Sequence, residues 1–209
     1  MLFTLLVFKR PDAFYLCALN ATLGFKASPV NGLWFNIFGG YRISKDELFC
    51  NLVDADGYYF THFLQDKAKT AYGGAELKYG YKDWFDASLK GTFYSWKTDN
   101  ENEELYLMTK PKFELNFYAE AKVFEGLKVY LGYEYVQRKE YVIEEGNSSR
   151  DFGLGNISNL SVGASYTFLK DLSVFGRVNN LLNKQYYYEY GYPAEKLNVL
   201  AGLLWFLVK

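Results

Sequence analysis

The sequence has little of what usually identifies a function. It holds two cysteines and one histidine among 209 residues, and its formal net charge is only −1. Cys17 falls in an expected strand and Cys50 in an expected loop, so neither a disulfide nor a metal-ligand spacing is indicated, and no cofactor is predicted. A near-neutral chain also lacks the basic face that nucleic acid requires, which excludes nucleic acid as a partner.

Long hydrophobic runs are missing as well. No stretch approaches the ~18 apolar residues of a membrane-spanning helix. Half of the residues are nevertheless hydrophobic, which excludes a disordered polymer. Aromatic side chains are abundant, with 20 Tyr and 18 Phe, and this usage fits strand-rich structure.

Apolar and polar residues alternate along most of the chain, which indicates β-strands. In the segment 112–123, Phe113, Leu115 and Phe117 share one face, whereas Glu114 and Asn116 share the other. We count about nine such strands, several of them longer than the five or six residues usual in soluble sheets. Their connections are hairpin-like, so the pattern predicts an all-β antiparallel meander of about nine long strands.

The connections alternate between short and long. The short ones are Ala27–Gly32, Lys82-Asp83, Glu125-Gly126 and Leu169–Asp171. The long ones lie at about 43–68, 97–109, 139–157 and 182–196. Outer-membrane β-barrels have tight periplasmic turns and longer external loops, so the meander is interpreted as part of a transmembrane β-barrel. A β-sandwich and a lipocalin-type barrel stay open as alternatives, because periodicity does not say which face is covered.

Aromatic residues gather near the expected strand ends, where girdles at the lipid headgroups would place them. They are Tyr41, Tyr79, Tyr81, Trp84 and Trp96. Strand propensity alone explains any one of them taken singly.

The last part of the chain carries the most specific motif. Its residues are Asn180, Leu181, Leu182, Asn183, Lys184 and Tyr186, then Gly191, Tyr192 and Pro193, and a closing strand follows at 197–205. In order and spacing these elements resemble the C-terminal end of TonB-dependent outer-membrane receptors. The chain departs from that family after Pro193, where Ala194-Glu195-Lys196 stands in place of a Pro-Gly-Arg type sequence, and at its end, which is Lys209 rather than an aromatic residue.

The resemblance implies a barrel of about 22 strands with an N-terminal plug. It implies uptake of a scarce, bulky nutrient (siderophore, cobalamin, glycan or peptide) across the cell outer membrane of a Gram-negative bacterium. Residues 12–209 are then expected to be the C-terminal part of the barrel, without the plug. Residues 1–11 are an uncertain segment, either an extra strand or a misassigned start. The alternative is a self-standing outer-membrane barrel that acts as a passive pore or a structural protein.

The same resemblance implies the partners. They are outer-membrane lipid, the missing plug and remaining barrel strands, TonB through the absent N-terminal part, and a surface lipoprotein.

No catalytic constellation is visible, and the chain is not expected to be an enzyme. The single histidine, His62, lies in the longest expected loop with nothing that frames it as a base. Exposed rings can stack on a ligand, so the aromatic cluster of this loop is the predicted ligand contact, although packing within the loop explains it too. Its members are Tyr58, Tyr59, Phe60, His62 and Phe63.

Charged residues recur on the polar face of the strands. In the family such residues face the lumen and hold the plug: here they are Arg42, Lys78, Glu114, Glu120, Glu134, Arg138 and Arg177. The pairs Gly39-Gly40 and Gly73-Gly74 lie inside expected strands, where glycine makes room for a bulky neighbour.

Overall fold

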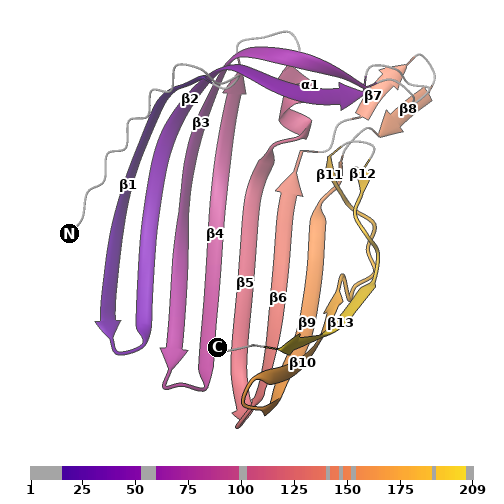
Figure 1. Ribbon diagram of the computed structural model, residues 1–209. Coiled ribbons are helices and arrows are strands. Elements are labelled where there is room, and N and C mark those ends of the chain that lie inside the picture. Colours follow the sequence, from indigo (N-terminus) through magenta and orange to yellow (C-terminus); the bar gives the residue numbers. More distant parts are fainter. Residues whose placement is uncertain are drawn as a thin grey trace.

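Nine strands form one antiparallel sheet in the computed structural model, which describes residues 16–52, 60–98, 103–139, 142–145, 148–151, 154–189 and 192–205 (Figure 1). Their order in the sheet is β1-β2-β3-β4-β5-β6-β9-β10-β13, so strands that follow one another along the meander are also hydrogen-bonded neighbours. The bounds are Leu16–Val30 (β1), Leu33–Leu52 (β2), Phe60–Tyr81 (β3), Phe85–Thr98 (β4), Pro111–Phe124 (β5), Leu127–Arg138 (β6), Ile157–Leu169 (β9), Leu172–Asn179 (β10) and Asn198–Trp205 (β13). The predicted meander of nine long strands is confirmed.

The two ends of the sheet differ as the connection lengths predict. The tight turns lie together at one edge of the sheet, which we call the short-turn end (Figure 1). Gly32 and Gly126 sit in two of these turns with φ of 82° and 85°, a left-handed conformation that glycine adopts without steric cost. The long connections meet at the opposite edge, which we call the long-connection end.

The long connections contain strands and a helix, and the predicted extent of the first connection was wrong. β2 and β3 remain paired out to Leu52 and Phe60, so most of the interval 43–68 is a hairpin. Cys50, expected in a loop, lies in β2 opposite His62. Three further connections hold short elements: α1 (Glu103–Met108), the pair β7 (Val142–Glu145) and β8 (Ser148–Asp151), and the pair β11 (Tyr187–Glu189) and β12 (Tyr192–Pro193).

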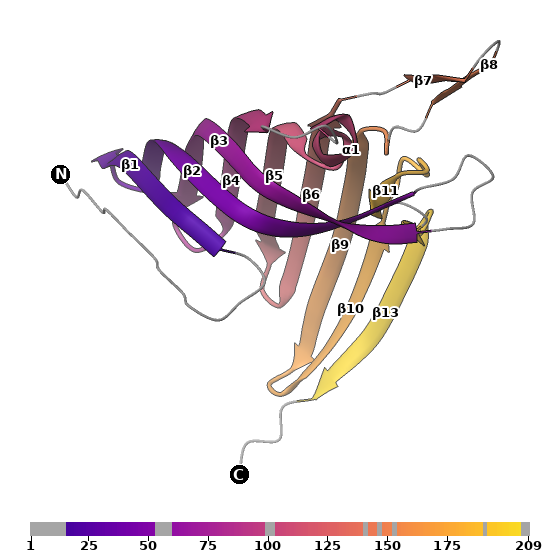
Figure 2. The same ribbon diagram turned by 90° about the horizontal axis from the view of Figure 1, so that it is seen from above.

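The sheet is curved and, within the described ranges, open. Seen from above it bends round, and the upper β2–β3 hairpin and α1 lie on the side toward which it bends (Figure 2). β1 pairs with β2 and β13 pairs with β10, and no pairing between β1 and β13 closes the described residues into a ring. No helix of the described chain is long and apolar enough to cross a membrane.

The large apolar side chains on the outer, convex face are exposed. Phe93 has 65% of its surface accessible, Ile37 57% and Leu203 69%. The residues that alternate with these along each strand point to the opposite, concave face, against which α1 packs. A sandwich would cover the apolar face with a second sheet, and a lipocalin-type barrel would turn it inward. Neither arrangement occurs in the described chain, because the apolar side chains face away from the protein.

Two glycines inside strands make room for aromatic rings, as expected. A Cβ on Gly40 would lie 2.4 Å from the ring of Tyr72, and one on Gly74 would lie 2.8 Å from the ring of Phe38. Both rings lie on the concave face, next to the glycine of the neighbouring strand.

Three of the predicted girdle residues are exposed at the short-turn end, whereas Tyr41 lies inside β2 and not near a strand end, and Trp96 faces the other way. The girdle at the lipid headgroups stays a prediction. Tyr79, Tyr81 and Trp84 are exposed and contact one another ring to ring. Trp96 instead lies on the concave face, packed on the cluster of Ala68 and Tyr106. The reason is the register, because Trp96 is an even-numbered residue of β4 and pairs with the buried Thr70.

The buried apolar side chains of the described chain all lie at the long-connection end. They are Ala68, Tyr106, Met108, Val136, Leu154, Ile157 and Tyr186. The sheet between this end and the tight turns is one layer thick, so it has no two-sided core.

Candidate functional site

The predicted lumen residues lie on the concave face, where tyrosines bind the carboxylates. Tyr94 donates a hydrogen bond to Glu114 (2.9 Å), and Tyr118 donates one to Glu120 (3.0 Å). Glu120 also accepts from Lys128 at 2.8 Å. The carboxylates are therefore held in fixed positions along the wall rather than left free in the lumen.

The cations of the same face lie over aromatic rings. Lys78 is 5.0 Å from the centroid of Trp34, and Arg177 is 5.9 Å from the centroid of Tyr130. Arg42 is 5.7 Å from the centroid of Trp96. Such contacts orient a cation while leaving its other donors available. The sequence predicted the charged residues of this face but not their contacts with rings. Its signal for these contacts is that Trp34, Trp96 and Tyr130 share the polar parity of their strands.

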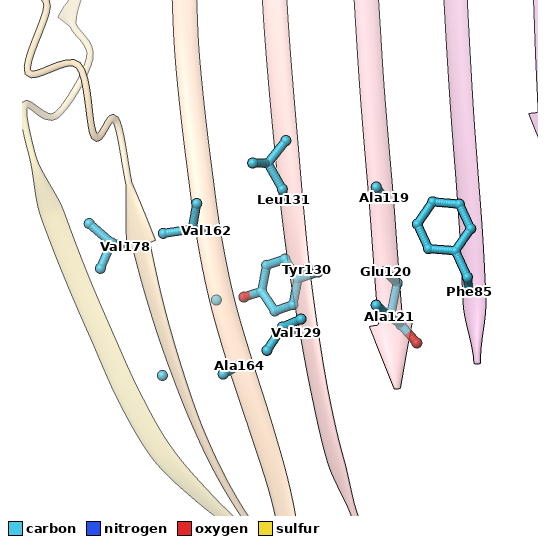
Figure 3. A pocket seen from close by; sticks show the side chains of 12 residues that line it. Phe85, Ala119, Glu120, Ala121, Val129, Tyr130, Leu131, Val162, Ala164 and Val178 are labelled. Atoms are coloured by element: carbon cyan, nitrogen blue, oxygen red, sulfur yellow. The ribbon is translucent and has the colours of Figure 1, made fainter. Parts of the chain in front are cut away.

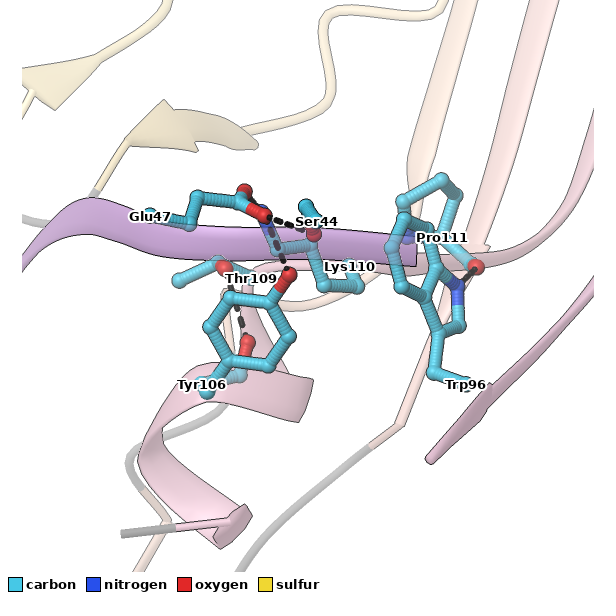
Figure 4. A network of polar contacts seen from close by, with 7 residues as sticks. All are labelled: Ser44, Glu47, Trp96, Tyr106, Thr109, Lys110 and Pro111. Atoms are coloured by element: carbon cyan, nitrogen blue, oxygen red, sulfur yellow. Dashed lines mark hydrogen bonds and ion pairs between the residues drawn. The ribbon is translucent and has the colours of Figure 1, made fainter. Parts of the chain in front are cut away.

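A polar network fastens the β2–β3 hairpin over the concave face (Figure 4). Glu47, in the upper part of β2, accepts hydrogen bonds from Tyr106 of α1 (2.7 Å), from Ser44 (3.0 Å) and from Lys110 (2.5 Å). The Lys110 ammonium also lies 4.4 Å from the Tyr106 ring centroid. We call Glu47, Tyr106 and Lys110 the hairpin latch.

The latch is largely shielded from water, which decides its electrostatics. The Glu47 and Lys110 side chains are only 14% and 18% exposed. Burial raises the pKa of the Glu47 carboxyl, but the charge of Lys110 and the hydrogen bonds from Lys110, Tyr106 and Ser44 outweigh it, so the pKa lies below the ordinary 4.5. Burial, followed by the hydrogen bond to Glu47, raises the pKa of the Tyr106 hydroxyl. Glu47 is thus a carboxylate and Tyr106 a neutral donor at neutral pH.

Sequence reasoning did not find the latch. Glu47 is 59 residues from Tyr106 and 63 from Lys110, and no local spacing links them. The latch forms only because β2, β3 and β4 stand side by side and bring two consecutive long connections together.

The C-terminal motif forms a tight turn after β10. Asn180 and Asn183 both have positive φ, 49° and 50°, a left-handed conformation that asparagine tolerates better than most residues. The buried Asn180 side chain donates to the carbonyls of Lys184 (2.8 Å) and Glu195 (3.1 Å) and accepts from the Lys184 amide. Asn183 accepts from the Leu197 amide. The motif therefore ties β10 to the start of the closing strand.

The rest of the motif is divided between core and surface. Tyr186 is 5% exposed and packs on Val136 and Ile157, whereas Leu181 and Leu182 are each 42% exposed. Lys184, Tyr192 and Pro193 are exposed, and Gly191 lies outside the described residues.

Arg138 and Glu134 hold the last long connection onto the wall. The Arg138 guanidinium donates to the Tyr187 carbonyl at 2.6 Å, and Tyr188 donates to Glu134 at 3.0 Å. Burial and then the nearby Glu134 charge raise the pKa of the Tyr188 hydroxyl, which keeps it a donor. Two of the predicted plug contacts thus have partners within this chain.

The structure brings only part of the predicted aromatic ligand contact into view. Phe60, His62 and Phe63 belong to β3, with backbones opposite Leu52, Cys50 and Phe49. Tyr58 and Tyr59 lie outside the described residues, as do residues 1–11. The role of this cluster stays a prediction.

A hollow of about 590 Å³ lies on the wall across β5, β6, β9 and β10 (Figure 3). The hollow is present because several lining residues of the convex face have small side chains, among them Ala119, Ala121, Ala164 and Gly176. Its lining is mainly apolar. No group of three or more His, Cys, Asp or Glu that could hold a metal is found in the described part of the chain.

No protein-family model and no curated protein sequence matches this chain. Solved structures do match it, and they share the fold of an outer-membrane receptor wall. The pyoverdine outer-membrane receptor FpvA of Pseudomonas aeruginosa is 16% identical with a TM-score of 0.66, over 90% of this chain and 29% of the receptor. A variant of the ferric enterobactin receptor PfeA of the same bacterium is 16% identical with a TM-score of 0.61, over 90% and 31%.

A third match is the siderophore receptor PirA of P. aeruginosa, 18% identical with a TM-score of 0.57, over 90% of this chain and 29% of that one. The chain therefore spans less than a third of the length of these receptors. At such identities the likeness establishes the fold, and the predicted β-barrel wall is confirmed.

Proposed function

We propose that this chain is the C-terminal wall of a TonB-dependent receptor in the outer membrane of a Gram-negative bacterium, and that the receptor imports a siderophore. The main support for this proposal is the curved sheet with one apolar and one polar face, which matches the walls of siderophore receptors over 90% of this chain. Its convex face is exposed and apolar, as lipid requires, and its concave face is polar.

The wall contributes shape and contacts rather than covalent chemistry. The carboxylates of Glu114 and Glu120 and the cations of Lys78 and Arg177 face the lumen, where a plug domain would find acceptors and donors of both signs. The β2–β3 hairpin would stand at the external mouth, with Phe60, His62 and Phe63 of β3 as ligand contacts. From the sequence alone, Tyr58 and Tyr59 are proposed as further contacts.

The open edges argue against a self-standing pore built from the described strands. In lipid each unpaired backbone group costs several kcal/mol, so a spanning sheet has to close. The free edges of β1 and β13 would therefore pair with strands beyond the described residues, as the larger receptor barrel supplies.

Membrane location and transport can be tested together in the native host. Sodium carbonate should leave the protein in the outer-membrane pellet. Deleting the gene should abolish growth on one ferric siderophore under iron limitation, and deleting TonB should abolish the same uptake. Release into the carbonate supernatant would contradict the membrane assignment, whereas uptake that survives loss of TonB would favour the passive pore.

A further inference from the structure

We propose that the hairpin latch is an autoinhibitory contact, which holds the β2–β3 hairpin across the external mouth of the lumen until the latch is released. The inference rests on the proposed function, because that function places the long-connection end outside the cell. It adds a control of ligand entry to the transport proposed above.

The β2 strand is irregular at Asp46, just before the latch. Asp46 has a φ of 53°, a left-handed conformation that is uncommon outside glycine. In a regular strand successive side chains point to opposite faces, so residues three apart lie on different faces. Ser44 nevertheless donates a hydrogen bond to Glu47 (3.0 Å), which places both side chains on one face. The alternation therefore breaks at Asp46, and Glu47 turns toward α1 rather than away from it.

Beyond this break the hairpin runs across the long-connection end. Seen from above, it passes over the concave face from the β2–β3 side toward β9, β10 and β13 (Figure 2). In the side view it arches over the upper ends of other strands (Figure 1). Its backbone pairing continues to Leu52 and Phe60, so the crossing segment is a paired ribbon. A paired ribbon in this position narrows the way into the lumen.

The latch fixes this ribbon at its base. Glu47 accepts hydrogen bonds from Tyr106 at 2.7 Å and from Lys110 at 2.5 Å, and Tyr106 is 0% exposed. Opposite Glu47 in the hairpin, the Gln65 side chain is also 0% exposed. All of these groups belong to this chain, so a ligand contributes nothing to closing the latch.

The strength of the latch decides how often the hairpin opens. An ion pair and hydrogen bonds shielded from water favour the closed form by about five- to thirtyfold. If a ligand enters only through the open form, its association rate falls in proportion to the open fraction. Glu47, Tyr106 and Lys110 are therefore positioning residues, which act on the ligand through the place of the hairpin.

The test uses the full-length receptor, with Lys110→Met as the latch variant and Lys112→Met as its control. Lys112 is an exposed lysine two residues along the chain, so its loss is the same charge change outside the latch. Spin labels at Thr61 of β3 and Ser165 of β9, with Cys17 and Cys50 replaced by serine, report the distance between the hairpin and the wall by double electron–electron resonance. Stopped-flow mixing measures the association and dissociation of the ferric siderophore that the growth test identifies.

The original protein should give one narrow distance between the labels, whereas Lys110→Met should add a second, longer distance. Association of the ferric siderophore should become about five- to thirtyfold faster in Lys110→Met. The control should stay within about twofold of the original protein in association rate and should keep the narrow distance.

Two further variants act on the same device by other routes. Asp46→Val puts a β-branched residue at a positive φ, which is strongly disfavoured, so the strand should straighten and association should again become faster. Tyr106→Phe keeps the ring and removes only the hydroxyl donor, so it should give a smaller rise in the same direction. It replaces Lys110→Met if that variant fails to reach the membrane.

An association rate unchanged in both Lys110→Met and Asp46→Val would overturn the proposal, and so would equal changes in the latch and control variants. Faster dissociation with unchanged association would also overturn it, because the hairpin would then retain a bound ligand instead of delaying its entry. The spin labels keep the two levels of inference apart. If no ferric siderophore supports growth, the proposed function fails, whereas a distance that Lys110→Met leaves unchanged ends the latch proposal alone.

Discussion

The middle of the sheet and its long-connection end are stabilised in different ways. In the middle, residues such as Ile37, Leu77 and Phe93 keep 57%, 44% and 65% of their surface exposed. At the long-connection end, Tyr106 and Ile157 are buried to 0% and 1% exposure. The middle therefore depends on a surrounding apolar phase, whereas the long-connection end has a protein core of its own.

This contrast explains where the polar networks lie. A core at the long-connection end shields Glu47 and Lys110, so a carboxylate and an ammonium can hold two loops together there. In the middle the concave face is lined by polar side chains, and its contacts orient the charges of Glu114, Glu120 and Lys78.

The largest expected effect comes from placing a charge on the convex face. Phe117→Arg should destabilise the inserted protein by about 2–4 kcal/mol, because an arginine near the bilayer midplane loses its hydration. Asn116→Arg, one residue away on the concave face and opposite Glu134, should change stability little. Unfolding by denaturant from lipid vesicles measures both, and equal losses would show that lipid does not cover the convex face.

Removing the Asn180 side chain should cost about 2–3 kcal/mol at the long-connection end. Asn180→Ala leaves the Lys184 and Glu195 carbonyls without their donor and puts a Cβ-bearing residue with no side-chain polar group at positive φ. Asn180→Gly relieves the backbone strain and should recover up to about 1 kcal/mol of that loss. Full recovery by glycine would mean that the hydrogen bonds contribute nothing.

Breaking the latch should cost about 1–2 kcal/mol and should act locally. Lys110→Met leaves the Glu47 carboxylate buried without its cation, which loosens the hairpin but not the tight turns. Hydrogen exchange of the β3 amides 62–70 should accelerate, while that of the amides 75–81 should not. Uniform acceleration along β3 would contradict the division between the two regions.

Of the four predicted changes, acidification should have the smallest effect on stability, and it should act by releasing the latch. The pKa of Glu47 is depressed in the folded protein, so its contribution is present above the unfolded value of about 4.5 and is lost as the pH falls through the folded value. Exchange at 62–70 should therefore rise below about pH 4.5, and Glu47→Gln should remove that pH dependence. A rise centred above pH 6 would exclude Glu47 as its cause.

The sequence by itself determined the wall. In the middle of the sheet, alternation of apolar and polar residues predicts which face a side chain takes, and two lengths of connection sort the strand ends, since both properties are local to a strand or a turn. The C-terminal motif was equally readable, because Asn180 and Asn183 are suited by residue type to left-handed turns.

Only the tertiary structure decided which face points outward, how far β2 and β3 extend, and that Trp96 faces inward. It alone paired Glu47 with Tyr106 and Lys110, and Lys45 with Lys67. These facts depend on register between strands and on contacts about 20 to 60 residues apart, and no short-range pattern carries such information, because the partners meet only once the sheet has formed.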